Sequence, residues 1–215
     1  MILKDRRILI TSGPTWVPID SVRVISNIAT GETGLLLAQK LARLGAKVTL
    51  LTSQGETCCL DKRIRVLRFR YFDELQRAVS KELKSITYDI VIHSAAVSDY
   101  RPAQTIKQKL SSNKKIWKLN LMPTPKIIEQ IKKLRKDTFL VGFKFIPQVK
   151  FNALLKASRH LIERADADLV VANTISKKKY QAYLVDKETS IGPMLSKNSL
   201  AKSLTLQLTK TWRKN

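Results

Sequence analysis

Acidic residues, cysteines and long apolar runs are all scarce in this chain of 215 residues. It has 17 Asp and Glu residues against 40 Lys and Arg residues, which gives a formal net charge of +23. The two cysteines, Cys58 and Cys59, are neighbours and cannot build a disulfide framework, so we expect a reducing, cytoplasmic setting. No run of eighteen apolar residues occurs, which argues against a membrane-spanning helix, and no apolar segment of signal-peptide length follows the first charged residues.

Apolar residues nevertheless make up 44% of the chain, which excludes a disordered polycation, because such chains lack the side chains for a core. No internal repeat or linker divides the sequence, so residues 1–215 are expected to form a single domain. The surplus of positive charge predicts anionic partners, but it does not distinguish among nucleic acid, lipid and small phosphates.

Short apolar runs alternate with amphipathic segments over the first 175 residues, which is typical of a doubly wound α/β sheet. Strands are expected at residues 7–11, 47–52, 64–69, 89–93, 138–143, 168–172 and 180–185, and helices at 34–44, 73–86, 123–136, 152–165 and 197–210. The predicted fold is therefore α/β, with a mostly parallel Rossmann-like sheet and an irregular C-terminal third. In such sheets ligands bind beyond the carboxyl ends of the strands.

Small and polar residues follow the first expected strand, from Thr11 to Thr15. Neither the GxGxxG fingerprint nor the GxxxxGK[ST] phosphate loop is present, so this segment is either a nucleotide contact or a plain turn. The loop that follows is unusually long and ends at Gly31 and Gly34, which open a helix whose free N–H groups attract anions. Within it, Asn27 is either a donor to an oxyanion or a residue that caps the helix or shapes a turn.

A second polar stretch follows the fourth expected strand. The small residues 94–96 leave room for a base or a ribose, and Asp99 can bind hydroxyl or amino groups or pair with Arg101. His93 could act as a general base, although a lone histidine at a buried strand end is more often structural. The lysine-rich residues 107–115 are either a solvated charge run or a mobile lid that reaches phosphate oxygens.

These segments together resemble the phosphopantothenate–cysteine ligase family, also called phosphopantothenoylcysteine synthetases. The specific signal is Ile-Ser-Asn before Gly-x-x-Gly, combined with Ala-Ala-Val-x-Asp-Tyr-Arg-Pro. The matching stretches follow the family's order over residues 6–205; they are 10–15, 18–20, 22–23, 25–27, Gly31, Gly34, 95–102, 109–112, 123–125, 141–143 and 171–173.

The resemblance implies a single ligase domain that acts in coenzyme A biosynthesis. The carboxylate of 4′-phosphopantothenate would attack the α-phosphate of a nucleoside triphosphate and release pyrophosphate. The amine of L-cysteine would then attack the acyl-nucleotide and displace the nucleoside monophosphate. The resemblance favours CTP over ATP, with Mg²⁺ accompanying the triphosphate, and it implies a homodimer. In many bacteria this ligase is fused behind a flavin-dependent decarboxylase, which we expect here to be separate or absent.

The resemblance also implies roles for individual residues. Asn27 and Arg23 match residues of the second step, and Ala96 matches a small position, so Asn27 and Ala96 are expected to bind phosphopantothenate. Lys109 matches the lysine of the first step, with Lys107 as its rival because the loop length varies. No residue is assigned to a metal. The matching nucleotide contacts are Gly13, His93, Ser94, Ala95, Asp99, Lys109, Pro123, Thr124, Pro125, Phe143, His160 and Arg164.

Several positions depart from the family pattern. Glu32 stands where a lysine is common, so no phosphate contact is expected from that position. Ser111 replaces the second lysine of Lys-Ile-Lys, and the acidic residue usual after Gly142-Phe143 is missing. The substrate pocket is therefore expected to differ in detail.

Two other function classes remain open. A short-chain NAD(P)-dependent oxidoreductase shares the sheet architecture, and Tyr183 and Lys187 have its Tyr-x-x-x-Lys spacing, but its glycine fingerprint is missing. A nucleic-acid-binding module would account for the charge and for basic patches such as residues 131–136, but no RNA-recognition, zinc or homeodomain pattern is present. We therefore expect nucleic acid to bind only through non-specific electrostatics.

Overall fold

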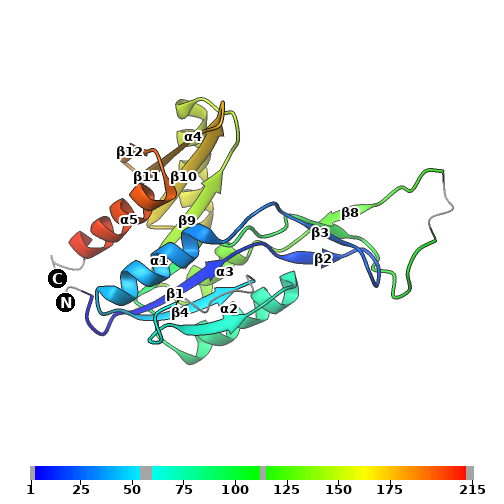
Figure 1. Cartoon of the computed structure of the whole chain (residues 1–215), viewed down its shortest axis with the longest axis horizontal. Helices are drawn as coiled ribbons and strands as arrows, with labels where there is room; N and C mark the ends of the chain where they lie inside the picture. Colours follow the sequence, from blue (N-terminus) through cyan, green and yellow to red (C-terminus); the bar gives the residue numbers. More distant parts are fainter. Residues whose placement is uncertain (1–2, 54–59, 112–114, 212–215) are drawn as a thin grey trace.

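The computed structural model describes residues 3–53, 60–111 and 115–211, and one large sheet organises these residues (Figure 1). Its six parallel strands are β1 (Arg7–Ser12), β4 (Lys47–Thr52), β5 (Arg65–Arg68), β6 (Ile90–His93), β9 (Phe139–Phe145) and β10 (Leu169–Ser176). They lie in the order β5-β4-β1-β6-β9-β10, so the chain builds outward from β1 first on one side and then on the other. This order is that of a doubly wound fold, and the predicted fold class is confirmed.

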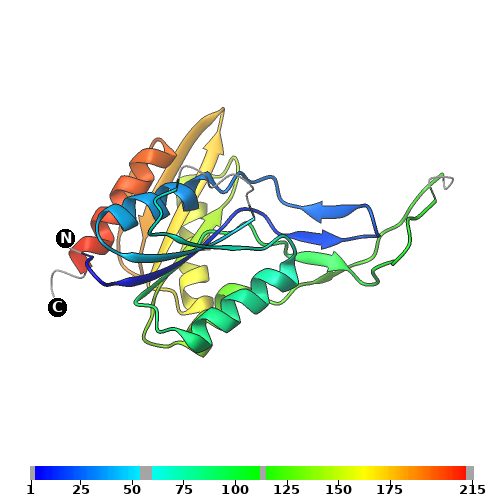
Figure 2. The ribbon, with the colours of Figure 1, turned by 60° about the horizontal axis from the view of Figure 1, so that its bottom comes forward.

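Helices pack on both faces of the sheet and bury one hydrophobic cluster on each side. One face carries α1 (Glu32–Arg43) and α5 (Lys197–Thr211); the other carries α2 (Phe72–Ser85), α3 (Ile127–Leu134) and α4 (Phe151–Ala165) (Figure 2). Side chains alternate between the faces along each strand, so Ile8 and Ile10 join the first cluster and Leu9 joins the second. Among the described helices, none combines the length and apolarity needed to cross a membrane.

The predicted strands and helices are all present, with their bounds shifted by a few residues. The C-terminal third is more regular than predicted. It leaves the parallel pattern because β11 (Lys179–Val185) pairs antiparallel with β10, and β12 (Ser190–Met194) pairs antiparallel with β11. These two strands extend the sheet at one edge.

An arm made of two short antiparallel ribbons projects beyond the carboxyl edge of the sheet (Figure 1). One ribbon pairs β2 (Trp16–Pro18) with β3 (Val24–Ser26), and the other pairs β7 (Tyr100–Pro102) with β8 (Leu121–Pro123). The sequence analysis did not predict these strands, because three residues are too few to establish a period. The arm carries the segment between β7 and β8 away from the sheet.

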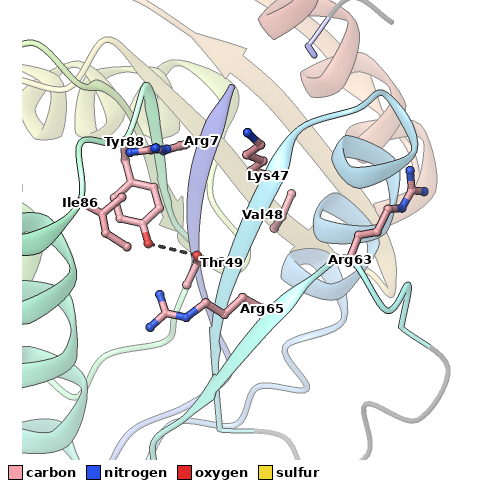
Figure 3. A pocket seen from close by; sticks show the side chains of 8 residues that line it. All are labelled: Arg7, Lys47, Val48, Thr49, Arg63, Arg65, Ile86 and Tyr88. Atoms are coloured by element: carbon pink, nitrogen blue, oxygen red, sulfur yellow. Dashed lines mark hydrogen bonds between the residues drawn. The ribbon is translucent and has the colours of Figure 1, made fainter. Parts of the chain in front are cut away.

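A cavity of ≈ 340 Å³ lies at the opposite, amino-terminal edge of the sheet (Figure 3). Beside it, the buried carboxylate of Glu82 accepts hydrogen bonds from Arg65 at 2.7 and 3.0 Å and from the Tyr88 hydroxyl at 2.6 Å. The Tyr88 oxygen also lies 3.0 Å from the hydroxyl of Thr49. Burial opposes ionisation of Glu82, but the bonds from Arg65 and Tyr88 outweigh it, so the pKa of Glu82 is lowered. This network ties α2 to β4 and β5.

Replacement of Glu82 by Gln should lower the free energy of unfolding at neutral pH by about 1–3 kcal/mol, because Arg65 loses a charged acceptor. Folding lowers the pKa of Glu82, so its contribution is present above the unfolded-state pKa and is lost as the pH falls through the folded-state pKa. Urea titrations at neutral and acidic pH measure the difference. The exposed Glu163→Gln variant is the control, and equal stability losses in the two variants would contradict the assignment.

Candidate functional site

A cleft of ≈ 1020 Å³ opens at the carboxyl ends of β1, β6, β9 and β10. β1 and β6 are parallel neighbours at the point where the strand order reverses, which is where doubly wound folds bind ligands. The cleft is lined by residues 26–34, 93–97, 124–128 and 143–145, and by Gly13, Asp99, Leu161, Arg164, Asn173, Ile175, Tyr180 and Lys197.

Two glycines bring the backbone close to the ends of β1 and β6. Gly13 has φ +87°, and a Cβ at this position would overlap the hydroxyl of Ser53. A Cβ on Gly34, in the first turn of α1, would stand 2.5 Å from Cβ of Ser12 and 3.1 Å from Oγ of Ser94. The amino end of α1 therefore sits against the strand ends, where its free N–H groups favour an anion.

Thr11 holds the segment that follows β6. Its hydroxyl lies 2.9 Å from Nδ1 of His93 and accepts a hydrogen bond from the Ala95 N–H at 3.2 Å, and its carbonyl accepts one from Ser94 Oγ at 2.6 Å. Burial lowers the pKa of His93 to about 4, so the ring is neutral near pH 7 and is a weak base. The structural interpretation of His93 is therefore favoured over the general-base interpretation.

Asn27 lines the cleft next to Ala96. Its Nδ2 group donates to the carbonyl oxygen of Ala96 at 3.2 Å and to that of Val97 at 2.9 Å. Both amide hydrogens thus have acceptors on the segment after β6, and Asn27 ties β3 to that segment. Donation to an oxyanion would require the exchange of one of these bonds.

Asp99 pairs with Lys126, whose Nζ lies 2.5 Å from a carboxylate oxygen. The expected alternative, a pair with Arg101, does not form, because Arg101 lies beside Asp73 at 3.9 Å. Thr124 is buried and donates from its N–H to the Asp99 carbonyl at 2.9 Å. Thr124 and Pro125 line the cleft, whereas Pro123 lies outside the lining on β8. Lys126 was not predicted to be a site residue. In the sequence, only its position directly after Pro-Thr-Pro could have indicated a place in the cleft.

The helix α4 contributes Arg164 to the cleft but not His160. Arg164 lines the cleft and its Nε lies 2.7 Å from Oε1 of Glu129. His160 is exposed and lies outside the lining, one turn earlier on the helix. Phe143 reaches the cleft from β9, as predicted.

The structure places Arg23, Lys107 and Lys109 on the arm rather than in the cleft lining. The Arg23 guanidinium donates to Asp20 at 2.8 Å and to the Leu110 carbonyl at 3.4 Å. The buried Asp20 carboxylate also accepts the N–H of Leu110 at 3.2 Å. These bonds fix the residue next to Lys109 to the turn between β2 and β3, while both lysines remain exposed. Residues 112–114 of the expected lid lie outside the described residues.

The two faces of the sheet divide the cleft into two sides. A Cβ on Gly142 would contact Ile128 of α3 and Leu161 of α4, so Gly142 faces these helices. Lys144, two residues further along β9, lies on the same face, which is called the α3 side. The opposite, α1 side holds Glu32, Asn173, Tyr180 and Lys197, none of which was predicted as a site residue. Glu32 and Lys197 are 165 residues apart in the sequence, so no local motif could have brought them together.

The carboxylates of the cleft decide whether it can hold Mg²⁺. Within the described residues, no three His, Cys, Asp or Glu side chains form a group that could hold a metal. Asp99 and Glu32 are the carboxylates in the described lining, and their side chains are 68% and 54% exposed. Each of them is paired with a lysine, so the protein offers Mg²⁺ at most one or two carboxylates here, and such an ion would need phosphates as its further ligands.

The oxidoreductase pattern is not found at the cleft. Tyr183 lies on a strand, packs against Phe151 with ring centroids 4.6 Å apart, and lies outside the cleft lining. Lys187 follows that strand and is exposed. This alternative therefore finds no support in the geometry.

This chain is similar to proteins about twice its length and to solved chains of about its own length. The coenzyme A biosynthesis bifunctional protein CoaBC of Thermococcus kodakarensis is 36% identical over 207 residues, which is 94% of this chain and 50% of that protein. The chain thus spans about half the length of the curated relatives it matches. The DNA/pantothenate metabolism flavoprotein of Streptococcus pneumoniae superposes with a TM-score of 0.85 at 27% identity, over 96% of this chain and 99% of that one.

A further solved structure, a Cab2 mutant in complex with phosphopantothenate-cysteine, shares the fold with a TM-score of 0.76 at 18% identity. That superposition covers 97% of this chain and 88% of the other. The family described as DNA/pantothenate metabolism flavoprotein C-terminal domain matches residues 3–211. The family resemblance inferred from the motifs is confirmed: the chain belongs to the DNA/pantothenate metabolism flavoprotein C-terminal domain family.

Proposed function

We propose that this chain joins 4′-phosphopantothenate to L-cysteine through an acyl-nucleotide, in coenzyme A biosynthesis. The observation that carries the proposal is the cleft at the point where the strand order reverses. Asn27, Ala96, the amino end of α1 and the Asp99–Lys126 ion pair all line this one cleft. The relatives support it, since one is a coenzyme A biosynthesis protein and another structure holds phosphopantothenate-cysteine. Because the chain spans about half of the bifunctional relatives, the proposal concerns the ligase step alone.

The first step brings two polyanions together. A carboxylate oxygen of phosphopantothenate attacks the α-phosphorus of the nucleotide, the bond to the β-phosphate oxygen breaks, and pyrophosphate leaves with the electron pair. Lys126, Lys144 and Arg164 on the α3 side supply positive charge around the nucleotide. The arm adds Lys109 or Lys107. The free N–H groups of α1 add a second, uncharged anion site.

The second step needs a donor for a developing oxyanion. The cysteine amine attacks the acyl carbon, the carbonyl oxygen becomes the oxyanion, and collapse expels the nucleoside monophosphate while the amine loses a proton to water. One Nδ2 hydrogen of Asn27 would move from the carbonyl of Ala96, its longer bond at 3.2 Å, to this oxygen. The small side chain of Ala96 leaves room for the intermediate.

The finer parts of the proposal rest on the family resemblance. We take CTP as the preferred nucleotide over ATP, with Mg²⁺ carried by the triphosphate, and the cytoplasm as the location. The substrates bind in the described cleft, and Gly13, residues 93–95 and Asp99 hold the nucleotide from the strand ends.

The arm favours a homodimer. It exposes large apolar side chains: Val22 at 62%, Ile116 at 78%, Trp117 at 41%, Leu121 at 46% and Met122 at 40%. Patches of this kind mark protein–protein contacts. Arg23 and Lys109 lie on the same arm, outside the cleft of their own chain. We propose that a second copy covers the arm and thereby brings these cations to a cleft.

The proposed function predicts that the protein releases pyrophosphate from CTP only when 4′-phosphopantothenate is present, and that added L-cysteine then yields CMP. A coupled pyrophosphate assay, run with CTP and with ATP, measures both the reaction and the nucleotide preference. Pantothenate without its phosphate is the control substrate. Release that does not depend on phosphopantothenate would contradict the proposal.

Asn27→Asp should leave pyrophosphate release in place and slow cysteine addition by about 10²–10³-fold, because a carboxylate repels an oxyanion and cannot donate to it. Single-turnover assays that separate acyl-nucleotide formation from its consumption measure the two steps. The exposed Asn152→Asp on α4 is the control. Cysteine addition at the wild-type rate would remove Asn27 from the second step.

Lys109→Gln should slow the first step by about tenfold or more, because the triphosphate loses a cation of the arm. Lys107→Gln is the matched variant, since both lysines are exposed on the same segment. Pyrophosphate release under single-turnover conditions compares them. If Lys107→Gln alone slows the step, the resemblance has been aligned two residues out of register.

A further inference from the structure

The cavity at the amino-terminal edge of the sheet has no part in the proposed reaction. Its volume of ≈ 340 Å³ falls within the range of small-molecule sites. The cleft lies at the carboxyl ends of the strands, so the length of β1 separates the two hollows, and they share no described lining residue. A ligand of this cavity would therefore bind apart from the proposed substrates.

The cavity is lined by four cations, and no carboxylate belongs to its described lining (Figure 3). The cations are Arg7, Lys47, Arg63 and Arg65, and the other lining residues are Val48, Thr49, Ile86 and Tyr88. Charges of one sign that line a hollow with low-dielectric walls concentrate ions of the opposite sign there. The lining therefore indicates an anionic ligand.

The sheet sets three of these cations side by side. Arg7, Lys47 and Arg65 begin the neighbouring strands β1, β4 and β5. Each stands an even number of residues before a leucine that packs in or against the cluster under α2, so all three side chains leave the sheet on that face. Neighbouring strands are about 4.8 Å apart, so this row of cations spans about 10 Å at the backbone. Like charges so placed repel one another, and an anion between them would relieve the repulsion.

Two cations of the row keep donors for a ligand. Lys47 pairs with Asp5 at 2.9 Å, but these side chains are 64% and 66% exposed, and the ammonium has three hydrogens to donate. Among the described residues, no hydrogen bond or ion pair holds the Arg7 guanidinium, which carries five N–H donors. Arg63, outside the row, is neutralised locally by Asp61.

The third cation of the row has a fixed orientation. Glu82 accepts two hydrogen bonds from the Arg65 guanidinium and a third from Tyr88. The Tyr88 oxygen lies 3.0 Å from the hydroxyl of Thr49, and Thr49 is paired in register with Arg65. This side of the cavity is therefore ordered before a ligand arrives, which reduces the cost of binding.

We propose that the cavity binds a diphosphate, either as the free anion or as part of a larger phosphorylated molecule. A diphosphate matches the row of cations better than a single phosphate, because it carries charge at two phosphorus centres. Arg7 donates a fork of N–H groups to one phosphoryl group, Lys47 binds beside it as a point charge, and Arg65 faces the other phosphoryl group.

The test titrates the protein with inorganic pyrophosphate and follows backbone amide shifts by NMR together with heats of binding. Amides of residues 47–49 and 86–88 should shift. The double variant Arg7→Gln/Lys47→Gln should weaken binding at these amides by about tenfold or more, because two charged donors are lost. Both side chains are exposed, and Arg65 is left in place because it holds Glu82, so urea unfolding should match the wild type.

The control is Lys133→Gln/Lys136→Gln, which removes the same charge from two exposed residues at the end of α3 and just after it, and should bind as the wild type does. Equal weakening in the two double variants, or amide shifts confined to the cleft, would overturn the cavity as a diphosphate site. CDP is the second probe: tighter binding of CDP at the same amides identifies a larger phosphorylated ligand, and equal or weaker binding identifies the free anion. The ligase proposal is tested separately, by pyrophosphate release at the cleft.

Discussion

Parallel pairing of β1 with β6 is the constraint on which the site depends. The helices that follow these two strands leave on opposite faces, so a gap must open where the strands end. Thr11 closes the base of that gap by binding three consecutive residues, His93 to Ala95, and Gly34 lets α1 settle against it. Any substituent that separates β1 from β6 would move both walls of the cleft at once.

The site has one part on the main sheet and one part on the arm, and they are built differently. The first part uses strand ends and helix ends of the main sheet, which two packed clusters support. The second part is the arm, where short ribbons depend on side-chain bonds such as those of Asp20 to Arg23 and Leu110. The residues matched to nucleotide chemistry lie mainly on the first part, and the cations matched to catalysis lie on the second.

The sheet, its order of elements and the location of the cleft could be predicted from the sequence, because hydrophobic periodicity and strand-end polarity are local signals. Asn27, Ala96 and Asp99 were matched through the family motifs, and all three lie in the lining of the cleft. The Glu32–Lys197 pair could not be found, because it depends on how two distant helices pack. Arg23 and Lys109 were recognised, but their place on the arm follows from hydrogen bonds of Asp20 that no pattern of residue types encodes.

The positions of β1 and α5, the first strand and the last helix, bear on how this fold can be joined to others. The start of β1 and the end of α5 lie together at the amino-terminal edge of the sheet, away from the cleft and the arm (Figures 1 and 2). A domain attached through a short linker at either end would therefore lie on the side of the sheet opposite the cleft, and it would leave the cleft and the arm uncovered.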